Sequence, residues 1–489
     1  MNEKALTKQK LSGAYYTPEA VVRSLVSWAT RGGSGRLLDP ACGDGRFLAA
    51  HSNSYGIERD EQAVRAARCA APHATVLTGD FFTWAESSAE RFDCVAGNPP
   101  FIRYQTFAGE TRRRALDICG RLGAQFSGLA SSWAPFIVAA TGLLKLDGRI
   151  AFVVPAEIGH APYAAPLLEY LAGSFRRVQV VAVREKLFPE LSEDCWLLYA
   201  EGHGGTADEL EFTVCERFAP SAAPPQPTLR IPLDDWRAIW GRRLRPMLLP
   251  SPVRNLYQLA SVDAESHRLR DIASIRIGYV SGANDFFHLR PSEAAEWRIP
   301  REFLTPTVRN GKALPQRELA QLDVDRWLAA DEPVLLLRLP SDAKLPPAVA
   351  EYLDCNAGHE ARRAFKCRTR TPWWSVPDVR IPDYYLSYMS GAAPALVRNA
   401  GGASCTNSVH ALQSLDERGM RAAHAAWSTP FVRLSCEVEG HPLGGGMLKL
   451  EVREAGRILF PAAALGALML RDAIDEALTT MQRWRHRGE

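Results

Sequence analysis

The tetrapeptide Asn98-Pro99-Pro100-Phe101, which follows an apolar run over residues 92–97, carries the most informative chemistry in the chain. An exocyclic amino nitrogen on an aromatic base is a poor nucleophile, because its lone pair is delocalised into the ring. The Asn98 side-chain oxygen and the Pro99 carbonyl oxygen can accept the two amine hydrogens and shift the nitrogen toward tetrahedral geometry. The prolines restrict the backbone that holds these acceptors, and Phe101 offers a face on which a base can stack. The alternative is that the four residues only form a turn.

A second group of residues predicts the methyl donor. An apolar run ends in the loop Asp39-Pro-Ala41-Cys-Gly43-Asp44-Gly45, and an apolar segment typical of a helix follows. Glycine lets the backbone approach a ligand closely, because it lacks a Cβ atom and tolerates positive φ. A dinucleotide site would need a third glycine to hold a pyrophosphate. The carboxylate of Asp44 disfavours pyrophosphate and attracts a cation, and S-adenosylmethionine carries both a sulfonium and an amino group.

Acidic residues also end the next two predicted strands. Glu58 closes the run 54–58, where a carboxylate can accept hydrogen bonds from both hydroxyls of a ribose. Asp80 follows the run 74–77 and precedes Phe81, which suits an adenine ring whose amino group needs an acceptor. The alternative for Asp39, Glu58 and Asp80 is a helix cap or a turn. Acids at three successive strand ends favour a cofactor site.

Short apolar runs alternate with amphipathic stretches in the first half of the chain, which predicts a parallel sheet with crossover helices. Thr17 is expected to cap a helix that has Pro18 in its first position and ends near Ala29. Asp147-Gly148 is expected to form a turn. Further helices are expected over 133–144 and 164–171, and strands over 36–38, 54–58, 74–77, 94–97, 149–154, 178–183 and 195–200. The predicted class is therefore α/β and Rossmann-like.

A length of 489 residues exceeds one ordinary core and predicts two domains. Four prolines among small residues at 219–227 indicate a linker. We therefore expect a catalytic domain over 1–218, a linker over 219–230 and a second domain over 231–489. The second half loses the regular alternation and is rich in Trp, Tyr, Pro and Arg.

The composition excludes several classes of protein. Hydrophobic residues make up 46% of the chain and charged residues 23%, which is typical of folded domains. The apolar runs are shorter than a membrane-spanning helix needs, and residues 1–10 are not followed by the apolar stretch of a secretory signal. We therefore expect a cytoplasmic protein without a membrane partner. The ten cysteines are scattered, so the sequence predicts neither a zinc site nor another metal site.

Basic residues gather in one segment of the second half, although the net charge is only +3. We expect this segment and the two tryptophans after it to contact DNA, through Arg362, Arg363, Lys366, Arg368, Arg370, Trp373 and Trp374. The alternative is that the basic side chains form a solvated face and the tryptophans belong to a core.

Taken in order, these motifs resemble those of the gamma-class adenine-N6 DNA methyltransferases of bacterial restriction-modification systems. Residues 13–18, which include Tyr16 and Thr17, resemble the N-terminal cofactor motif of that class. The glycine loop, Glu58, Asp80 and residues 98–101 resemble the motifs that follow it, and residues 148–155 resemble its fifth-strand segment. Phe188 matches a second aromatic residue that sandwiches the target adenine.

The resemblance implies a seven-stranded sheet with one antiparallel strand and an α+β target-recognition domain. Residues 277–287 resemble the opening of such a domain, and residues 303–311 resemble a segment that often follows it. It further implies double-stranded DNA as substrate, S-adenosylmethionine as cofactor, flipping of the target base and a separately encoded restriction endonuclease. We expect a monomer. The alternatives are a methyltransferase that modifies an RNA guanine amine or a protein glutamine, and a catalytically inactive DNA-binding relative.

Overall fold

A computed structural model describes residues 16–486 of the chain, apart from residues 192, 343, 464 and 466–470. Residues 13–15 of the expected N-terminal cofactor motif lie outside the described residues. The chain divides into two compact units, Met1–Leu248 and Leu249–Glu489. No helix among the described residues is long and apolar enough to cross a membrane.

The nine described strands of the first unit form one sheet, in the order β3-β2-β1-β4-β5-β7-β6-β8-β9. The sheet is mostly parallel, and β7 and β9 run antiparallel to their neighbours. The strands are β1 (Leu37–Asp39), β2 (Ser54–Glu58), β3 (Thr75–Thr78), β4 (Phe92–Gly97), β5 (Leu144–Pro155), β6 (Phe175–Val183), β7 (Cys195–His203), β8 (Glu209–Cys215) and β9 (Leu229–Pro232).

The seven strands expected from the sequence are all present, and they confirm an α/β class with a mostly parallel sheet. The expectation of only seven strands was wrong, because β8 pairs with β6 and β9 pairs with β8 at the far edge. The proline-rich residues 219–227 lie between these two paired strands, and the last two residues of the expected linker belong to β9. The first compact unit therefore continues past residue 218 to Leu248.

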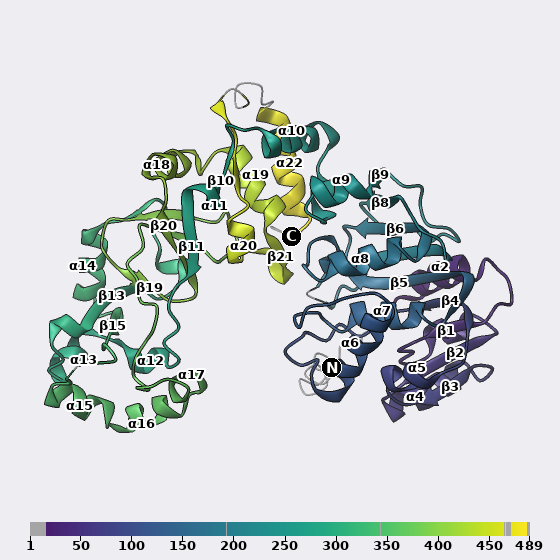
Figure 1. Cartoon of the computed structure of the whole chain (residues 1–489), viewed down its shortest axis with the longest axis horizontal. Coiled ribbons are helices and arrows are strands. Elements are labelled where there is room, and N and C mark those ends of the chain that lie inside the picture. The colour runs from purple at the N-terminus through teal and green to yellow at the C-terminus, as the bar shows by residue number, and fades with distance from the viewer. Residues whose placement is uncertain (1–15, 192, 343, 464, 466–470, 487–489) are drawn as a thin grey trace. The chain divides into compact units, whose positions relative to one another are not determined.

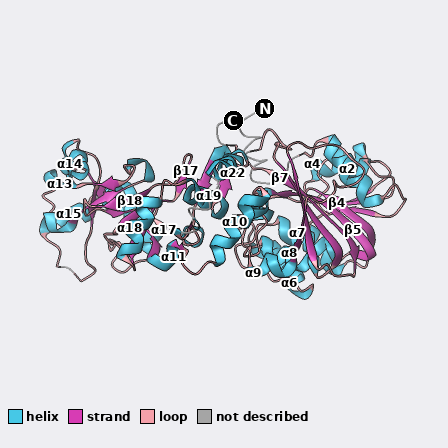
Figure 2. Ribbon diagram, turned by 90° about the horizontal axis from the view of Figure 1, so that it is seen from above, coloured by secondary structure: helices cyan, strands magenta, loops and turns pink. Residues whose placement is uncertain are grey.

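Helices cover both faces of this sheet (Figure 2). On one face α2 packs against β4 and β5, and on the other α7 and α8 pack against β5 and β6. The helices of this unit are α2 (Glu19–Thr30), α3 (Arg46–Ala49), α4 (Glu61–Ala70), α5 (Phe81–Ser87), α6 (Gly109–Arg121), α7 (Trp133–Thr141), α8 (Ala164–Ala172) and α9 (Leu233–Ala238).

Two local predictions in this unit were wrong. Pro18, not Thr17, occupies the N-cap position of α2, and the Thr17 side chain makes no cap hydrogen bond but is buried. Asp147-Gly148 does not separate a helix from a strand, because it lies inside β5. Asp147 has a φ of 60°, and the pairing of β5 with β4 shifts register there. The expected turn is thus a bulge within a longer strand.

The second unit contains several small sheets in the described residues (Figure 1). The five-stranded sheet has the order β11 (Ala273–Ile277), β20 (Val409–Ser414), β16 (Tyr384–Ser387), β18 (Leu396–Asn399) and β14 (Glu318–Leu319). A four-stranded sheet contains β12 (His288–Leu289), β15 (Leu335–Leu337), β13 (Leu304–Val308) and β19 (Ser404–Cys405). The remaining strands are β10 (His267–Arg268), β17 (Met389–Ser390), β21 (His441–Leu443), β22 (Met447–Lys449) and β23 (Leu459–Phe460).

Separate apolar cores cover the two faces of the five-stranded sheet. Leu412 and Tyr384 face a core that includes α18 (Glu417–Ala426) and α19 (Pro430–Glu439), while Tyr385 and Val409 face another. The other described helices are α10 (Ser251–Val262), α11 (Leu269–Ile272), α12 (Asn284–Phe287), α13 (Pro291–Glu296), α14 (Gln321–Ala329), α15 (Pro347–Leu353), α16 (Asn356–Arg363), α17 (Phe365–Arg368), α20 (Val452–Ala455) and α22 (Arg471–Arg483). This unit is therefore α+β, as expected.

Candidate active site

Polar residues occupy the carboxyl ends of four neighbouring parallel strands. Asp39 is the last residue of β1, Glu58 is the last residue of β2, and Asn98 directly follows β4. Asp80 follows β3 and caps α5. Because β3, β2, β1 and β4 pair in parallel, their carboxyl ends meet at one edge of the sheet, where α/β proteins bind ligands. The fold thus brings together residues that the sequence separates.

The glycine loop after β1 has the conformation that its composition predicts. Gly43 and Gly45 have φ values of 52° and 86°. A Cβ atom on Gly45 would lie 2.7 Å from the Cα atom of Ala67, so a larger residue does not fit there. A Cβ atom on Gly43 would meet no other atom within 4 Å. The Gly43 side of the loop is therefore open to a ligand.

Backbone N–H groups hold the Glu58 carboxylate beside this loop. Gly43 N–H donates to Glu58 Oε2 at 3.1 Å, and the N–H groups of Arg59 and Asp60 donate to Oε1 at 2.8 and 2.9 Å. These bonds tie the end of β2 to the glycine loop. They also fix the direction in which the carboxylate can accept further hydrogen bonds.

Asp39 is a buried carboxyl group at the centre of this edge. Its side chain is 1% exposed, and Oδ1 accepts the Ala41 N–H at 3.1 Å. A Cβ atom on Gly97 would lie 2.7 Å from Oδ1, so the end of β4 must be glycine for the two strands to approach. Burial raises the pKa of Asp39 to about 8, the Ala41 N–H opposes this rise, and the charges of Glu58 and Asp44 add to it. A cation bound here would favour the ionised form.

Arg46 links the N-terminal motif to the glycine loop. Its guanidinium pairs with Asp44 at 2.9 Å, donates to the Thr17 carbonyl at 3.1 Å and lies 5.2 Å from the ring centre of Tyr16. Tyr16 and Thr17 are thereby held beside the loop, as the sequence motif predicts. The role of Arg46 was not foreseen, although its position directly after Gly45 was a usable signal.

Asp80 and Phe81 lie at the end of β3, but both take part in local structure. Asp80 Oδ1 accepts hydrogen bonds from the Thr83 N–H at 2.9 Å and from the Thr83 hydroxyl at 3.0 Å, which is a helix cap. The Phe81 ring is 3% exposed and stacks on Phe136 with a centroid distance of 5.3 Å. Both of these hydrogen bonds use Oδ1 of Asp80, which leaves Oδ2 available to a ligand.

A buried serine braces the Asn-Pro-Pro-Phe corner. The Ser132 hydroxyl donates to the Pro100 carbonyl and accepts the Ile102 N–H at 3.0 Å. The Ser132 N–H in turn donates to the Ile102 carbonyl at 2.9 Å. The hydroxyl thus fixes the backbone on both sides of Phe101. The sequence carries no signal for this contact, because it joins segments 32 residues apart.

Replacing Ser132 by alanine is expected to slow methyl transfer about 10-fold without changing cofactor affinity. The partly buried Pro100 carbonyl and Ile102 N–H would lose their partner, at a cost of about 1–3 kcal/mol in the free energy of unfolding. Single-turnover rates, cofactor titration and thermal melting measure the three effects. Ser131→Ala is the matched control, since the Ser131 side chain contacts Tyr163 instead of the corner. Equal rates for the two variants would contradict the bracing role.

Phe101 and Phe188 belong to one hydrophobic cluster, although 87 residues separate them in the sequence. Phe101 is partly exposed, whereas Phe188 is 2% exposed. The roles of the two aromatic residues that the family resemblance implies stay predictions. Only Phe101 presents a face to a ligand in this structure.

In the second unit, the expected DNA-contacting residues divide into two groups. Arg362, Arg363, Lys366 and Arg368 are exposed at the ends of α16 and α17. Arg370 instead donates to the carbonyls of Ser281 and Val280 at 2.6 and 2.5 Å. Trp373 and Trp374 pack against an apolar core, as the alternative interpretation of the sequence holds.

The two segments that resemble the opening of a recognition domain lie side by side. The Tyr279 hydroxyl is 2.8 Å from Thr307 Oγ1 and 2.7 Å from His288 Nε2. A Cβ atom on Gly278 would lie 2.3 Å from the Cys405 carbonyl oxygen, so only glycine fits there. Residues 277–287 and 303–311 therefore form one structural unit around a buried tyrosine.

The strand order, the glycine loop after β1 and the acids at the strand ends define the class of the first unit. It has an α/β methyltransferase fold. The strand-end site corresponds to the ligand-binding edge of such sheets.

The chain belongs to the M.Eco57I family of type II restriction-modification methyltransferases. The family described as "Type II methyltransferase M.Eco57I, C-terminal domain" matches residues 242–486, which is half of the chain. The family described as "Eco57I restriction-modification methylase" matches residues 72–188, which include β4 and the Asn-Pro-Pro-Phe corner. The match to the C-terminal domain begins near the boundary between the two compact units.

Full-length relatives and a solved structure agree with this family. The type II methyltransferase M.XamI of Xanthomonas campestris pv. amaranthicola is 24% identical over 472 residues, covering 92% of this chain and 85% of its own. M.AccI of Acinetobacter calcoaceticus is 19% identical, covering 93% and 86%. The type IIL restriction-modification enzyme MmeI, solved in complex with DNA, aligns with a TM-score of 0.52 at 13% identity, over 95% of this chain and 70% of its own.

Proposed function

We propose that this protein transfers the methyl group of S-adenosylmethionine to the N6 amino group of adenine in duplex DNA. One observation carries the proposal. The Asn-Pro-Pro-Phe corner directly follows β4, and β4 pairs with β1, which ends in the buried Asp39 and leads into the open glycine loop. An amine acceptor site and a cofactor site thus adjoin.

The residues at the strand ends fit S-adenosylmethionine. The pKa of Asp39 is raised to about 8, and the positive charge at the methionine end of the cofactor would stabilise the ionised carboxylate. Glu58 and Asp80 Oδ2 are proposed to accept hydrogen bonds from the ribose and from the adenine amino group. Ala41, Gly43 and Gly45 supply backbone that a ligand can approach closely. When bound, the cofactor supplies an electrophilic methyl group on a sulfonium.

Asn98 and Pro99 are proposed to activate the acceptor nitrogen. The Asn98 side-chain oxygen and the Pro99 carbonyl would accept the amine hydrogens and draw the lone pair out of conjugation with the ring. No general base is required before the attack, because the nitrogen loses its proton after the new bond has begun to form. Pro100 and the Ser132 brace keep the acceptors in place, so that little reorganisation is needed at the moment of reaction.

The target adenine must leave the duplex to reach these acceptors, because N6 is inaccessible inside a base stack. The partly exposed Phe101 is the proposed stacking surface, which contributes about 1–3 kcal/mol per base. Phe188 is a buried member of the cluster against which Phe101 packs. The similarity of most of this chain to proteins named type II methyltransferases supports DNA over RNA or a protein glutamine as substrate.

The test is to incubate the purified protein with S-adenosylmethionine carrying a labelled methyl group. Unmethylated plasmid DNA, single-stranded DNA and tRNA are offered separately, and the products are digested to nucleosides for mass spectrometry. N6-methyldeoxyadenosine from the plasmid is the expected product. N4-methyldeoxycytidine would overturn the assignment to adenine, label in tRNA or protein would overturn DNA as the substrate, and cofactor binding without transfer would indicate an inactive relative.

A further inference from the structure

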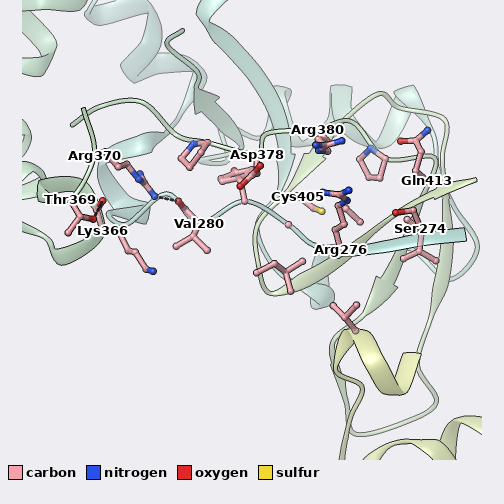
Figure 3. A pocket seen from close by; sticks show the side chains of 18 residues that line it. Ser274, Arg276, Val280, Lys366, Thr369, Arg370, Asp378, Arg380, Cys405 and Gln413 are labelled. Atoms are coloured by element: carbon pink, nitrogen blue, oxygen red, sulfur yellow. Dashed lines mark hydrogen bonds between the residues drawn. The ribbon is translucent and has the colours of Figure 1, made fainter. Parts of the chain in front are cut away.

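An open pocket of about 750 Å³ lies beside β11 and β20 in the second unit (Figure 3). Its lining includes four cationic side chains, Arg276, Lys366, Arg370 and Arg380, and the polar side chains of Ser274 and Gln413. Asp378 is the one acidic residue among the described residues that line it. The pocket is therefore suited to an extended anionic partner.

The pocket lies along an antiparallel ribbon, β11 and β20, at the edge of the five-stranded sheet, and the side chains of these strands alternate between two faces. β11 pairs antiparallel with β20, with Ser274 opposite Gln413 and Arg276 opposite Ala411. Directly opposed residues of an antiparallel pair share a face. The intervening residue Leu412 is buried in the core on the other face. Ser274, Arg276 and Gln413 therefore project together from one side of the ribbon.

Arg276 and Arg380 are exposed, and neither guanidinium forms an ion pair or hydrogen bond with another described residue. Arg370, which also lines the pocket, differs because it is bonded to the backbone at Val280, as the dashed line in Figure 3 shows. Ala411, opposite Arg276, is too small to obstruct the guanidinium. The two free arginines thus have no structural role that would account for them.

Gln413 also lines the pocket, and its side chain is held in a fixed orientation. Its Nε2 donates to Asp383 Oδ2 at 2.8 Å, and this oxygen also accepts the Ser414 N–H at 2.8 Å. The remaining N–H and the carbonyl oxygen of the Gln413 amide are free to face a partner. A glutamine amide with one donor and one acceptor available can bind an adenine edge, and an arginine fork can bind a guanine edge.

We propose that this ribbon reads the DNA sequence, with Arg276 and Gln413 contacting base edges in the major groove and Arg380 and Lys366 contacting phosphates. β11 is an edge strand of the five-stranded sheet, so its exposed side chains can approach a groove of B-form DNA. The inference rests on the proposed function, because it requires duplex DNA as the substrate, and it extends that function from catalysis to the choice of site. Within the basic cluster at residues 362–370, the proposal assigns a phosphate contact to Lys366 and no DNA contact to Arg370.

The experiment compares full-length variants by sequencing methylated sites in DNA from a host that expresses each one. Arg276→Ala and Gln413→Ala are each expected to relax one position of the recognised sequence and to lower kcat/KM on the cognate duplex about 10- to 100-fold. Arg276→Lys keeps the charge but loses the fork, so it should relax the same position. Arg380→Ala and Lys366→Ala should each weaken the binding of the protein to all duplexes by the same factor, whatever their sequence. Each should also reduce the slope of log affinity against log salt concentration by about one.

Arg418→Ala is the matched control, because Arg418 is an exposed arginine on α18 whose side chain has no bonded partner among the described residues. It should match the wild type. Recognised sites and rates that are the same in Arg276→Ala, Gln413→Ala and the control would overturn the inference, as would a uniform loss on all sequences with no relaxed position. Failure of the proposed function is distinct, because the wild type itself would then transfer no methyl group to DNA.

Discussion

Replacing Asn98 by alanine is expected to lower the single-turnover rate of methyl transfer by about 10²- to 10³-fold, which is the range seen when a positioned hydrogen-bonding group at a reacting centre is removed. The variant loses one of the two acceptors that hold the target amine, while Pro99 and the strand-end acids remain. Affinity for S-adenosylmethionine should therefore change by less than about threefold. Rapid-quench assays on cognate duplex measure the rate, and calorimetric titration measures the affinity.

The control is Ser131→Ala, a buried serine substitution outside the corner and the glycine loop. It should retain the wild-type rate. A second readout uses 2-aminopurine at the target position, whose fluorescence rises when the base leaves the stack. Asn98→Ala should still show this rise, because Phe101 is intact. Transfer within threefold of the wild type would contradict the role of Asn98, and a parallel loss of cofactor affinity would indicate a collapsed site instead.

The sequence predicts the residues at the proposed cofactor-binding edge of the sheet well, because each strand and the polar residue at its end lie in one short segment of the chain. The strand 54–58 was predicted with its observed bounds, and the others of the first four strands begin or end within two residues of the observed ones. β1 and β4 are buried along almost their whole length and therefore form short apolar runs, and a polar residue lies at the carboxyl end of each of the four strands. Once the order of strands is known, Asp39, Glu58 and Asn98 must share an edge.

Other features depend on contacts that local patterns do not encode. The Ser132 brace and the pairing of β8 with β6 join distant segments, and β9 follows a proline-rich stretch that is typical of a linker. In the second unit many strands contain only two to five residues, too few to show a period. The sequence also does not predict which arginine side chains are available to a partner. Arg370 lies in the basic segment but is bonded to the backbone, whereas Arg276 lies outside any basic cluster and is exposed.

Replacing Asp39 by asparagine is expected to weaken S-adenosylmethionine binding about 10- to 100-fold at pH 8, through the loss of one charge-assisted interaction. The same change should stabilise the cofactor-free protein. Asparagine keeps an oxygen that can accept the Ala41 N–H, and it removes a buried carboxyl group whose pKa is raised to about 8 by burial.

The sign of the pH dependence follows from that raised pKa. The unfolded chain releases the Asp39 proton near pH 4, whereas the folded protein keeps it until about pH 8. The free energy of unfolding of the wild type therefore decreases as the pH rises from about 4 to 8, by a total of about 3–5 kcal/mol from this group. Asp39→Asn lacks this decrease, so its melting temperature should exceed that of the wild type most at pH 8 and little at pH 4.

Cofactor binding has the opposite pH dependence in the same protein. Because the positive methionine end favours the ionised carboxylate, wild-type affinity should rise with pH up to about 8, and binding below that pH should release a proton. Calorimetric titrations of both proteins with the cofactor from pH 6 to 9 measure the affinity. Repeating them in two buffers of different ionisation enthalpy measures the proton release. The asparagine variant corrects for titration of the cofactor itself. Identical pH profiles for the two proteins would show that Asp39 does not hold the cation, while a flat melting difference across pH 4–8 would show that its carboxyl group is not protonated in the folded state.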